Sequence, residues 1–507
     1  MHSEDEIQNL VKTALDLAYK KFQEKKFEIV CVIAEQIIKI MPNEYAAMQI
    51  LGLSYSALQR HDESIKILSE CLEKNPDNPE TLNDLALCES NRGLYEKAIL
   101  LLEKAIQINP EMSELYSNLG LQYRHKEQHE KAIECFNKAL QIKPIPTTYA
   151  MMGGCYGELK QLEKAKKYIK KAIEMKPDFA AAHVDLASIL KLQGKWPDGF
   201  EEYEWRYDVH DQLQVWKKIY DPNKRWHGEE INGKRIIIHT EQGHGDAIHF
   251  VRYLKPLKDR GAYVILHCNE ILQGIFSSFA DEIFTQEPDK MSSWQEGNGI
   301  PKHEYHCPML SLPHIFKSIY TYPSYIKVDR KFDLSNYKDF YKIGIVWAGN
   351  PQHPNDRQRS CKLELFRQIS EMPNVKLFSL MKDTRTRAYV HENKPIDLTD
   401  GAEDMKVVDL RDQIHDFEDT AAIINSLDLV IGVDTAVMHL VGAMGKPSIL
   451  LLPWNPDWRW ELEGSFTIWY GNMHIIRQKT KGDWEPVFDE AKQILENYLI
   501  RHLDVID

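Results

Sequence analysis

The chain has 507 residues, of which 43% are hydrophobic and 27% are charged, a balance typical of a soluble globular protein. Because a single hydrophobic core rarely organises so long a chain, we expect about three domains. The formal net charge of -13 argues against general nucleic-acid binding, which requires clustered lysine and arginine to neutralise phosphates.

The sequence favours a cytoplasmic protein. Its eight cysteines are scattered and form no CxxC pair, so we expect reduced thiols and no zinc cluster. The acidic start MHSEDEIQNL lacks the basic and apolar layout of a signal peptide. No apolar run approaches the ~20 residues that span a bilayer, so we expect no transmembrane segment.

The first part of the chain repeats a helical unit. Proline stands at positions 42, 76, 110, 144 and 177, at intervals of 34, 34, 34 and 33 residues. Glycine recurs at Gly52, Gly120 and Gly153, where a small residue lets paired helices approach closely. The pattern resembles the tetratricopeptide repeat (TPR) family, which implies an α-solenoid over residues 1–205 with a concave groove. We interpret the groove as a site for an acceptor or partner; the alternative is a scaffold alone.

A different kind of domain follows the repeats, because all eleven tryptophans lie at residue 196 or later. From residue 234 apolar strands alternate with helices, first in RIIIHT and AYVILHC, and again from YKIGIVWAG to PSILLLP. Such strands indicate parallel sheets covered on both faces. We therefore predict an α + α/β protein in which the TPR solenoid precedes two Rossmann-like halves, residues 206–340 and 341–507. This arrangement fits the GT-B glycosyltransferase fold, with a closing C-terminal helix.

Four segments of the second part carry a more specific resemblance. GHGDAIHF, IVWAGNPQHPNDRQRS, IGVDTAVMHLVGAMGKPSILLLP and PDWRW are similar to segments of bacterial TPR-containing glycosyltransferases of the heptosyltransferase group, glycosyltransferase family 9. The resemblance implies inverting transfer of a sugar from a nucleotide-diphosphate sugar. Heptosyltransferases use a lysine near the phosphates, where this chain offers Arg357 and Arg359, so heptose and ADP do not carry over.

Asp246 is the candidate catalytic base. It follows the first strand of the first half, behind Gly243 and Gly245, which allow a tight loop and leave room for substrate. A carboxylate at this place can accept the proton of an attacking acceptor hydroxyl. The resemblance supports this role, because the matching aspartate is regarded as the base in heptosyltransferases. The alternative is that Asp246 caps the following helix.

We expect the donor diphosphate in the second half. The strand DLVIGVD feeds a helix at Thr435, and the N-terminal end of a helix attracts anions through its N–H groups. Asp434 is expected to cap that helix, and His439 either faces the cleft or packs in the core. Arg357 or Arg359 would neutralise the diphosphate, because guanidinium groups bind phosphate oxygens. The candidate donor-binding residues are Gly243, Gly245, Trp347, Gly349, Asn350, Arg357, Arg359, Asp434, Thr435, Ala436 and His439.

The sequence indicates no metal site and no cofactor besides the donor substrate. It contains no Asp-x-Asp, the usual metal-diphosphate clamp of the other large glycosyltransferase fold, so a helix dipole, backbone donors and arginine must stabilise the leaving group. A set of aromatic residues near the C-terminus is expected to pack in the core, with stacking on a sugar or base as the alternative. This set is Trp454, Trp458, Trp460, Trp469 and Tyr470.

The sequence therefore predicts a metal-independent, inverting glycosyltransferase that binds a nucleotide sugar and a protein or glycan acceptor. Self-association into an oligomer is compatible with it. Two other functions are open: a TPR interaction scaffold with a degenerate GT-B half, and a nucleotide-sugar 2-epimerase of the same fold. The scaffold is favoured if Asp246 and Arg359 do not face one cleft, and turnover of nucleotide sugars separates all three functions.

Overall fold

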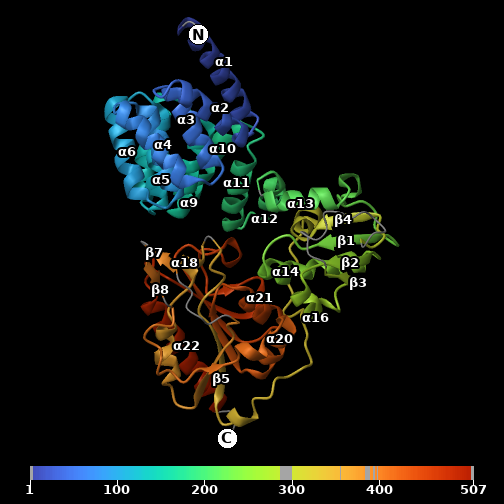
Figure 1. Ribbon diagram of the computed structural model, residues 1–507. Helices are drawn as coiled ribbons and strands as arrows, with labels where there is room; N and C mark the ends of the chain where they lie inside the picture. Colours follow the sequence, from blue (N-terminus) through green and yellow to red (C-terminus); the bar gives the residue numbers. More distant parts are fainter. Residues whose placement is uncertain are drawn as a thin grey trace. The chain divides into compact units, whose positions relative to one another are not determined.

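A computed structural model describes residues 4–209, 211–285, 300–353, 355–382, 389–391, 394–396 and 398–503. The chain forms two compact units, Met1–Leu186 and Ala187–Asp507. The first is helical and the second contains two largely parallel sheets, which confirms the predicted fold class (Figure 1). The division between the units lies before residue 205, because Trp196 and Phe200 pack into the core of the second unit.

The first unit is a series of helices, and from α1 to α10 each helix packs against the next one along the chain. A Cβ atom on Gly52 would lie 2.6 Å from Leu68 Cγ, and one on Gly120 would lie 2.6 Å from Phe136 Cε1. Paired helices therefore approach at positions without a side chain, as the sequence predicts. The helices are α1 (Glu4–Gln23), α2 (Phe27–Ile40), α3 (Tyr45–Ala57), α4 (His61–Lys74), α5 (Pro79–Asn91), α6 (Tyr95–Ile108), α7 (Ser113–His125), α8 (His129–Ile142), α9 (Pro146–Glu158), α10 (Leu162–Met175) and the first part of α11 (Ala180–Leu192), which continues into the second unit.

The turn inside each helix pair contains a left-handed residue at the same place in the repeat. After α3, Gln59 N–H donates to the carbonyl of Ser56 and Arg60 N–H donates to that of Tyr55, which closes the helix end. The residues with φ between 56° and 77° at these turns are Lys25, Gln59, Gly93, Glu127, Lys160 and Gly194. Their spacing of 34, 34, 34, 33 and 34 residues matches the spacing of the prolines. The backbone thus carries the repeat signature beyond the proline pattern at both ends.

These turns give a test of the repeat geometry. We expect Gln59→Gly to raise the free energy of unfolding by about 0.5–1 kcal/mol, because residues with a side chain are strained at positive φ. Gly93→Ala is the reverse change: the added Cβ meets no atom within 4 Å, so only the φ of 77° opposes it. We expect this variant to lose about 1 kcal/mol. Urea unfolding followed by far-ultraviolet circular dichroism measures both changes. Identical unfolding curves for the wild type, Gln59→Gly and Gly93→Ala would contradict this account.

The second unit begins with a helical segment, α12 (Trp196–Glu202), the 3-10 helix η1 (Tyr203–Asp208) and α13 (Asp211–Ile219). A sheet of four parallel strands follows in the order β3-β2-β1-β4. Along β1, Ile236 and Ile238 belong to the main core, whereas Ile237 packs with Trp216 and Tyr220 on the other face. The elements of this half are β1 (Arg235–His239), α14 (His244–Phe250), α15 (Leu254–Asp259), β2 (Tyr263–His267), α16 (Gln273–Phe276), β3 (Glu282–Phe284), β4 (Tyr305–Pro308) and α17 (Leu312–Phe316).

The second sheet has seven strands in the order β12-β13-β11-β10-β5-β6-β9, and only β12 is antiparallel to its neighbour. Its elements are β5 (Tyr341–Val346), α18 (Asp356–Arg359), α19 (Arg367–Ser370), β6 (Val375–Ser379), β9 (Val408–Asp409), α20 (Phe417–Ser426), β10 (Leu429–Val433), α21 (Ala436–Ala443), β11 (Ser448–Leu452), the 3-10 helix η10 (Trp458–Trp460), β12 (Phe466–Thr467), β13 (Tyr470–Arg477) and α22 (Glu485–Leu503). A separate hairpin pairs β7 (Tyr389–His391) with β8 (Lys394–Ile396).

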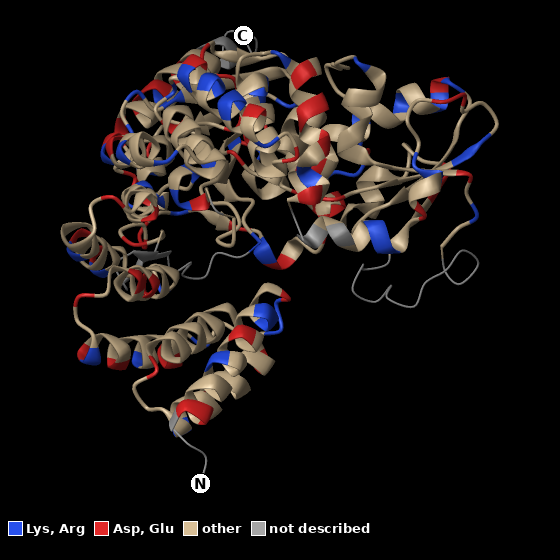
Figure 2. Cartoon of the chain, turned by 90° about the horizontal axis from the view of Figure 1, so that it is seen from above, with Lys and Arg blue, Asp and Glu red and all other residues tan. Residues whose placement is uncertain are grey.

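One hydrophobic core joins the two sheets of the second unit. It includes Ile238 from β1, Ile345 from β5 and Leu450 from β11, so the two halves pack directly on each other. Basic and acidic residues are interspersed along the chain and are not separated by sign (Figure 2). None of the described helices combines the length and the apolar character that a membrane span requires.

Candidate active site

A cavity of about 750 Å³ opens between the two halves of the second unit. It lies at the carboxyl ends of strands, because its lining comes from the segments that directly follow β1, β5, β6, β10 and β11. Open α/β sheets bind their ligands at this edge. The predicted residues that line the cavity are Gly243, Gly245, Asp246, Gly349, Asn350, Arg359, Asp434, Thr435, Ala436 and His439.

Two candidate residues are not part of this lining. Trp347 is 3% exposed and belongs to the hydrophobic core, because burial of β5 continues through Ala348. Arg357 has an exposed side chain and does not line the cavity, although it shares α18 with Arg359. Of the two arginines that the sequence proposed for a diphosphate, the structure therefore places Arg359 at the cavity.

The turn between β10 and α21 presents unsatisfied donors to the cavity. Thr435 occupies the N-cap position with extended backbone, and its side chain makes no capping hydrogen bond. Its buried hydroxyl has no hydrogen-bond partner among the described residues. The first intrahelical donor is Met438 N–H, so the N–H groups of Ala436 and Val437 precede the helical hydrogen-bond pattern. The expectation that Asp434 caps this helix is wrong, because the extended N-cap conformation falls one residue later, at Thr435.

Gly349 allows Arg359 to lie over the end of β5. A Cβ atom at Gly349 would be 2.2 Å from Asp356 Oδ1 and 2.5 Å from an Arg359 terminal nitrogen. The Arg359 Nε donates to Asp356 Oδ1 at 3.0 Å, and Asp356 is fully buried. Gly349 N–H in turn donates to Ser360 Oγ at 3.1 Å. The guanidinium is thus oriented by a buried carboxylate and remains beside the cavity.

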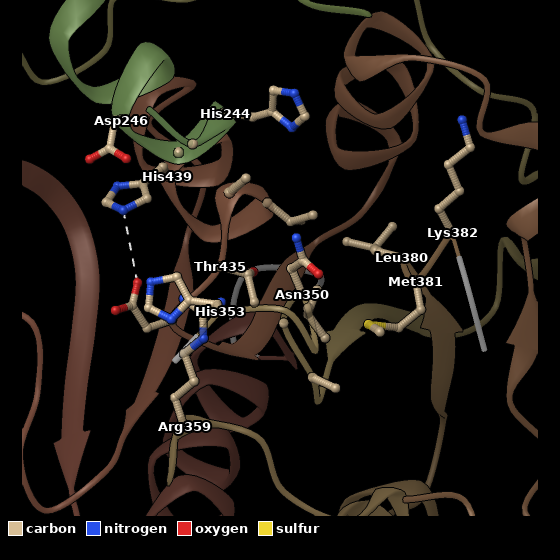
Figure 3. A pocket seen from close by; sticks show the side chains of 18 of the residues that line it. His244, Asp246, Asn350, His353, Arg359, Leu380, Met381, Lys382, Thr435 and His439 are labelled. Carbon is tan, nitrogen blue, oxygen red and sulfur yellow. Dashed lines mark ion pairs between the residues drawn. The ribbon is translucent and has the colours of Figure 1, made fainter. Parts of the chain in front are cut away.

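Asp246 lies in the first turn of α14, and its side chain is 22% exposed. The N-cap of α14 is Gly243, so the alternative interpretation of Asp246 as a helix cap is wrong. Burial raises the pKa of Asp246, and the nearby Arg459 guanidinium opposes that rise. Figure 3 shows Asp246 and His439 beside the same cavity as Thr435, Asn350 and Arg359. Candidate base and candidate phosphate ligands therefore face one space.

Arg459 and Asp457 complete the surroundings of Asp246, and sequence reasoning did not single them out. Arg459 donates to Asp246 and also to Asp457 Oδ1, the latter at 2.8 Å. Both residues line the cavity and lie in the segment PDWRW, whose resemblance to family motifs was the available signal. Asp457 also accepts the backbone N–H of Arg459 at 3.0 Å, which fixes the turn that presents the guanidinium.

A buried ion cluster holds the loop that precedes Asp246. Glu241 and Arg206 both have fully buried side chains and form an ion pair of 2.8 Å. Glu241 also accepts the Tyr207 hydroxyl at 2.9 Å and the Leu310 N–H at 3.0 Å. Breaking such a buried pair leaves an uncompensated charge, so the cluster strongly restrains the loop between β1 and α14.

His439 is a neutral side chain at the wall of the cavity. Its Nδ1 lies 2.8 Å from the Tyr470 hydroxyl, which also lies 3.0 Å from His249 Nδ1 on α14. Burial lowers the pKa of His439 well below the ordinary value, so the ring carries no charge at neutral pH. Trp460 stacks on His439 with ring centres 5.0 Å apart. The predicted packing role of the aromatic set is confirmed for Trp458, Trp460, Trp469 and Tyr470, which are all buried.

Gly245 serves helix packing. A Cβ atom at this position would lie 2.9 Å from His439 Cδ2 and 3.4 Å from Ala436 Cα. The expectation that Gly245 leaves room for substrate is therefore corrected: it leaves room for α21. At Gly243 the nearest atom would be Asp246 Oδ2 at 3.3 Å, so that glycine adjoins the carboxylate directly.

Comparisons with known proteins agree with this organisation. Tetratricopeptide repeat models match residues 55–119, 113–145 and 146–179. The model of glycosyltransferase family 9 (heptosyltransferase) matches residues 372–457, which include Thr435 and His439 but not Asp246. The protein FlbA of Caulobacter vibrioides is 23% identical over 347 residues, 63% of this chain and 56% of FlbA. The chain thus matches about half the length of this curated relative.

Two similar solved structures each cover less than half of this chain. A thermophilic TPR protein of Thermus thermophilus is 20% identical, with a TM-score of 0.33 over 36% of this chain and 98% of that one. Pseudomonas aeruginosa pilF is 18% identical, with a TM-score of 0.36 over 42% of this chain and 98% of that one.

The repeat matches show a TPR-containing protein, and part of its second unit is similar to a glycosyltransferase. More specifically, the chain combines tetratricopeptide repeats with a segment, residues 372–457, that matches glycosyltransferase family 9 (heptosyltransferase), as its motifs predict.

The packing at Gly245 can be tested directly. We expect Gly245→Ala to lower the free energy of unfolding by about 1–3 kcal/mol, because the added methyl forces α14 away from α21. Gly471→Ala is the matched control, since a Cβ there meets nothing within 4 Å. Urea unfolding of both variants measures the difference, and a Gly245→Ala transition that coincides with the control would show that the two helices are not closely packed.

Proposed function

We propose that this chain transfers a sugar from a nucleotide-diphosphate sugar to an acceptor hydroxyl, with inversion and without a metal ion. The observation that carries the proposal is the shared cavity. On one side Asp246 presents a partly exposed carboxylate, and on the other Thr435 and Arg359 present donors suited to a diphosphate. A base and a leaving-group site that face each other are what a single displacement requires.

The donor diphosphate binds at the start of α21. The helix end contributes the Ala436 and Val437 N–H groups and the positive end of its dipole, and Thr435 contributes a hydroxyl that lacks a partner in the described structure. Arg359 supplies a permanent positive charge. Within the described residues no three His, Cys, Asp or Glu side chains are grouped so as to hold a metal. These donors are the groups that we assign to the departing diphosphate.

Transfer then proceeds in one step. Asp246 accepts the proton of the acceptor hydroxyl as that oxygen forms a bond to the anomeric carbon. The bond from this carbon to the diphosphate oxygen breaks on the opposite face, and the electron pair leaves with the diphosphate. Arg359, Thr435 and the helix end stabilise the charge that develops there. Attack opposite the leaving group inverts the configuration of the sugar.

The acceptor is a protein or a glycan, and we assign its recruitment to the groove of the TPR helices. The scaffold alternative is disfavoured, because Asp246 and Arg359 do line one cavity. The 2-epimerase alternative has one supporting observation: four aspartates, Asp246, Asp416, Asp434 and Asp457, line the cavity. An epimerase converts a nucleotide sugar without any acceptor, so product analysis in the absence of acceptor distinguishes it from a transferase.

Asp246→Asn tests the base. We expect this nearly isosteric variant to keep its fold and its donor binding but to lose transfer by ~100-fold or more, the usual scale for a general base. Because burial raises the pKa of Asp246, kcat/KM of the wild type should fall toward low pH with a midpoint above the ordinary carboxyl range. Asp259→Asn, at an exposed position of α15, is the control. Near-normal turnover of Asp246→Asn would move the base elsewhere in the cavity.

A binding measurement tests the leaving-group site. We expect nucleoside diphosphate to bind equally well with and without EDTA. Thr435→Val should weaken binding about 10-fold by removing one hydrogen bond to a charged group, and Arg359→Ala should weaken it about 100-fold. Arg357→Ala is the matched comparison, because Arg357 lies on the same short helix but outside the cavity. Calorimetry that finds Arg357→Ala weakened and Arg359→Ala unchanged would overturn this placement.

A further inference from the structure

Lys191 is a buried lysine close to the site that the proposed reaction does not use. It lies in the last turn of α11 and is only 2% exposed. The following helix, α12, closes over it at Gly199, where a Cβ atom would lie 2.7 Å from Lys191 Cγ. The lysine stem therefore occupies a space that the fold has left for it.

The ammonium group of Lys191 sits among aromatic rings. Its Nζ lies 3.7 Å from the ring centre of Tyr203, 4.7 Å from that of Trp458 and 5.8 Å from that of Phe200. Such contacts stabilise a cation through the negative faces of the rings. No hydrogen bond or ion pair of this ammonium occurs among the described residues. Burial lowers the pKa of Lys191 to about 7, so the charge is held less firmly than that of an exposed lysine.

Trp458 connects this lysine to the candidate base. The Arg459 guanidinium carbon lies 4.5 Å from the centre of the same indole ring that Lys191 contacts. Arg459 in turn pairs with Asp246 and Asp457. Trp458 thus contacts two cations, one of which pairs with two carboxylates, and the charges of these four groups balance only while Lys191 is protonated.

We propose that Lys191 is a positioning residue for the Asp246–Arg459 pair, acting through Trp458 and through its charge. This inference rests on the proposed function only where Asp246 is taken as the base. With its ammonium in place, Asp246 remains ionised to lower pH, and Arg459 keeps the orientation that Trp458 gives it. Lys191 itself touches neither donor nor acceptor.

The sign of the expected effect follows from Coulomb's law. Removing a positive charge near a carboxylate destabilises the ionised form, so the pKa of Asp246 rises in Lys191→Met. The other charged or titratable groups that interact electrostatically with Asp246 are unchanged in this variant. They are Arg459, Asp457, Glu241, His353 and Tyr203.

The experiment compares the full chain as wild type, Lys191→Met and Lys195→Met. Methionine keeps the length of the lysine stem without its charge, and Lys195 is an exposed lysine four residues away, which makes it the matched control. Carbodiimide modifies protonated carboxyl groups, so labelling of Asp246 across a pH range of about 4.5–7.5, read by peptide mass spectrometry, reports its protonation without any need for activity. We expect the labelling midpoint to rise by about one pH unit in Lys191→Met and to stay in place in Lys195→Met.

Kinetics give the second readout. The acid limb of kcat/KM should move by the same amount, so that Lys191→Met loses about tenfold below the midpoint and little above it. A labelling midpoint equal in all three proteins overturns the role of Lys191. Absence of transfer by the wild type overturns the proposed function instead, and the labelling result then stands by itself. If Lys191→Met fails to fold, competitive acetylation of the wild type is measured instead. Lys191 must then react far more slowly than Lys195, because aromatic rings surround its ammonium group. Equal rates would overturn the proposal.

Discussion

Asp246 and the start of α21 face each other because α14 packs against α21. Helix α14 belongs to the first half of the second unit and α21 to the second half. Gly245 lets the first turn of α14 contact α21 at Ala436 and His439. Both helix starts therefore point into one cavity, one with a carboxylate and the other with free N–H groups. Because catalysis by orientation tolerates errors of less than about 1 Å, a close contact between backbones suits this task better than long side chains do. The Tyr470 hydroxyl, placed between His249 and His439, fixes the same two helices from behind.

The two arginines of the cavity are paired with carboxylates in the absence of ligand. Arg359 is oriented by Asp356, and Arg459 is shared by Asp246 and Asp457. Under the proposed function, a diphosphate that enters the cavity competes with a carboxylate for each guanidinium group. With a net charge of -13 the whole chain repels an anionic donor at long range. If a nucleotide sugar binds as proposed, its selection depends mainly on short-range hydrogen bonds to the start of α21. Long-range electrostatic attraction contributes little.

Local sequence patterns predicted the fold and part of the site, whereas long-range packing determined the rest. The prolines and the apolar segments recur regularly along the chain, so the solenoid and both sheets could be predicted from the sequence. Asp246 and Thr435 were found because they lie where a helix starts after a strand. Arg459 escaped notice because its partner Asp246 lies 213 residues away in the sequence. Trp347 was placed in the cleft because it follows a strand, and β5 does end at Val346, but burial continues through Ala348. The end of the first unit at Leu186 depends on where Trp196 packs, which the sequence period does not show.

The left-handed turns of the helical repeats recur at the same place in each repeat, so one repeat can be exchanged for another. Turn residues one repeat apart, such as Gln59 and Gly93, both have positive φ. The chain therefore leaves both turns in an equivalent way. Duplication or loss of the intervening stretch would rejoin equivalent ends and leave the neighbouring helix pairs in register. Slippage by any other number of residues would place a helix where a turn is needed. The array is thus built to change in copy number by whole repeats, and its length can vary without redesign of the domain that follows.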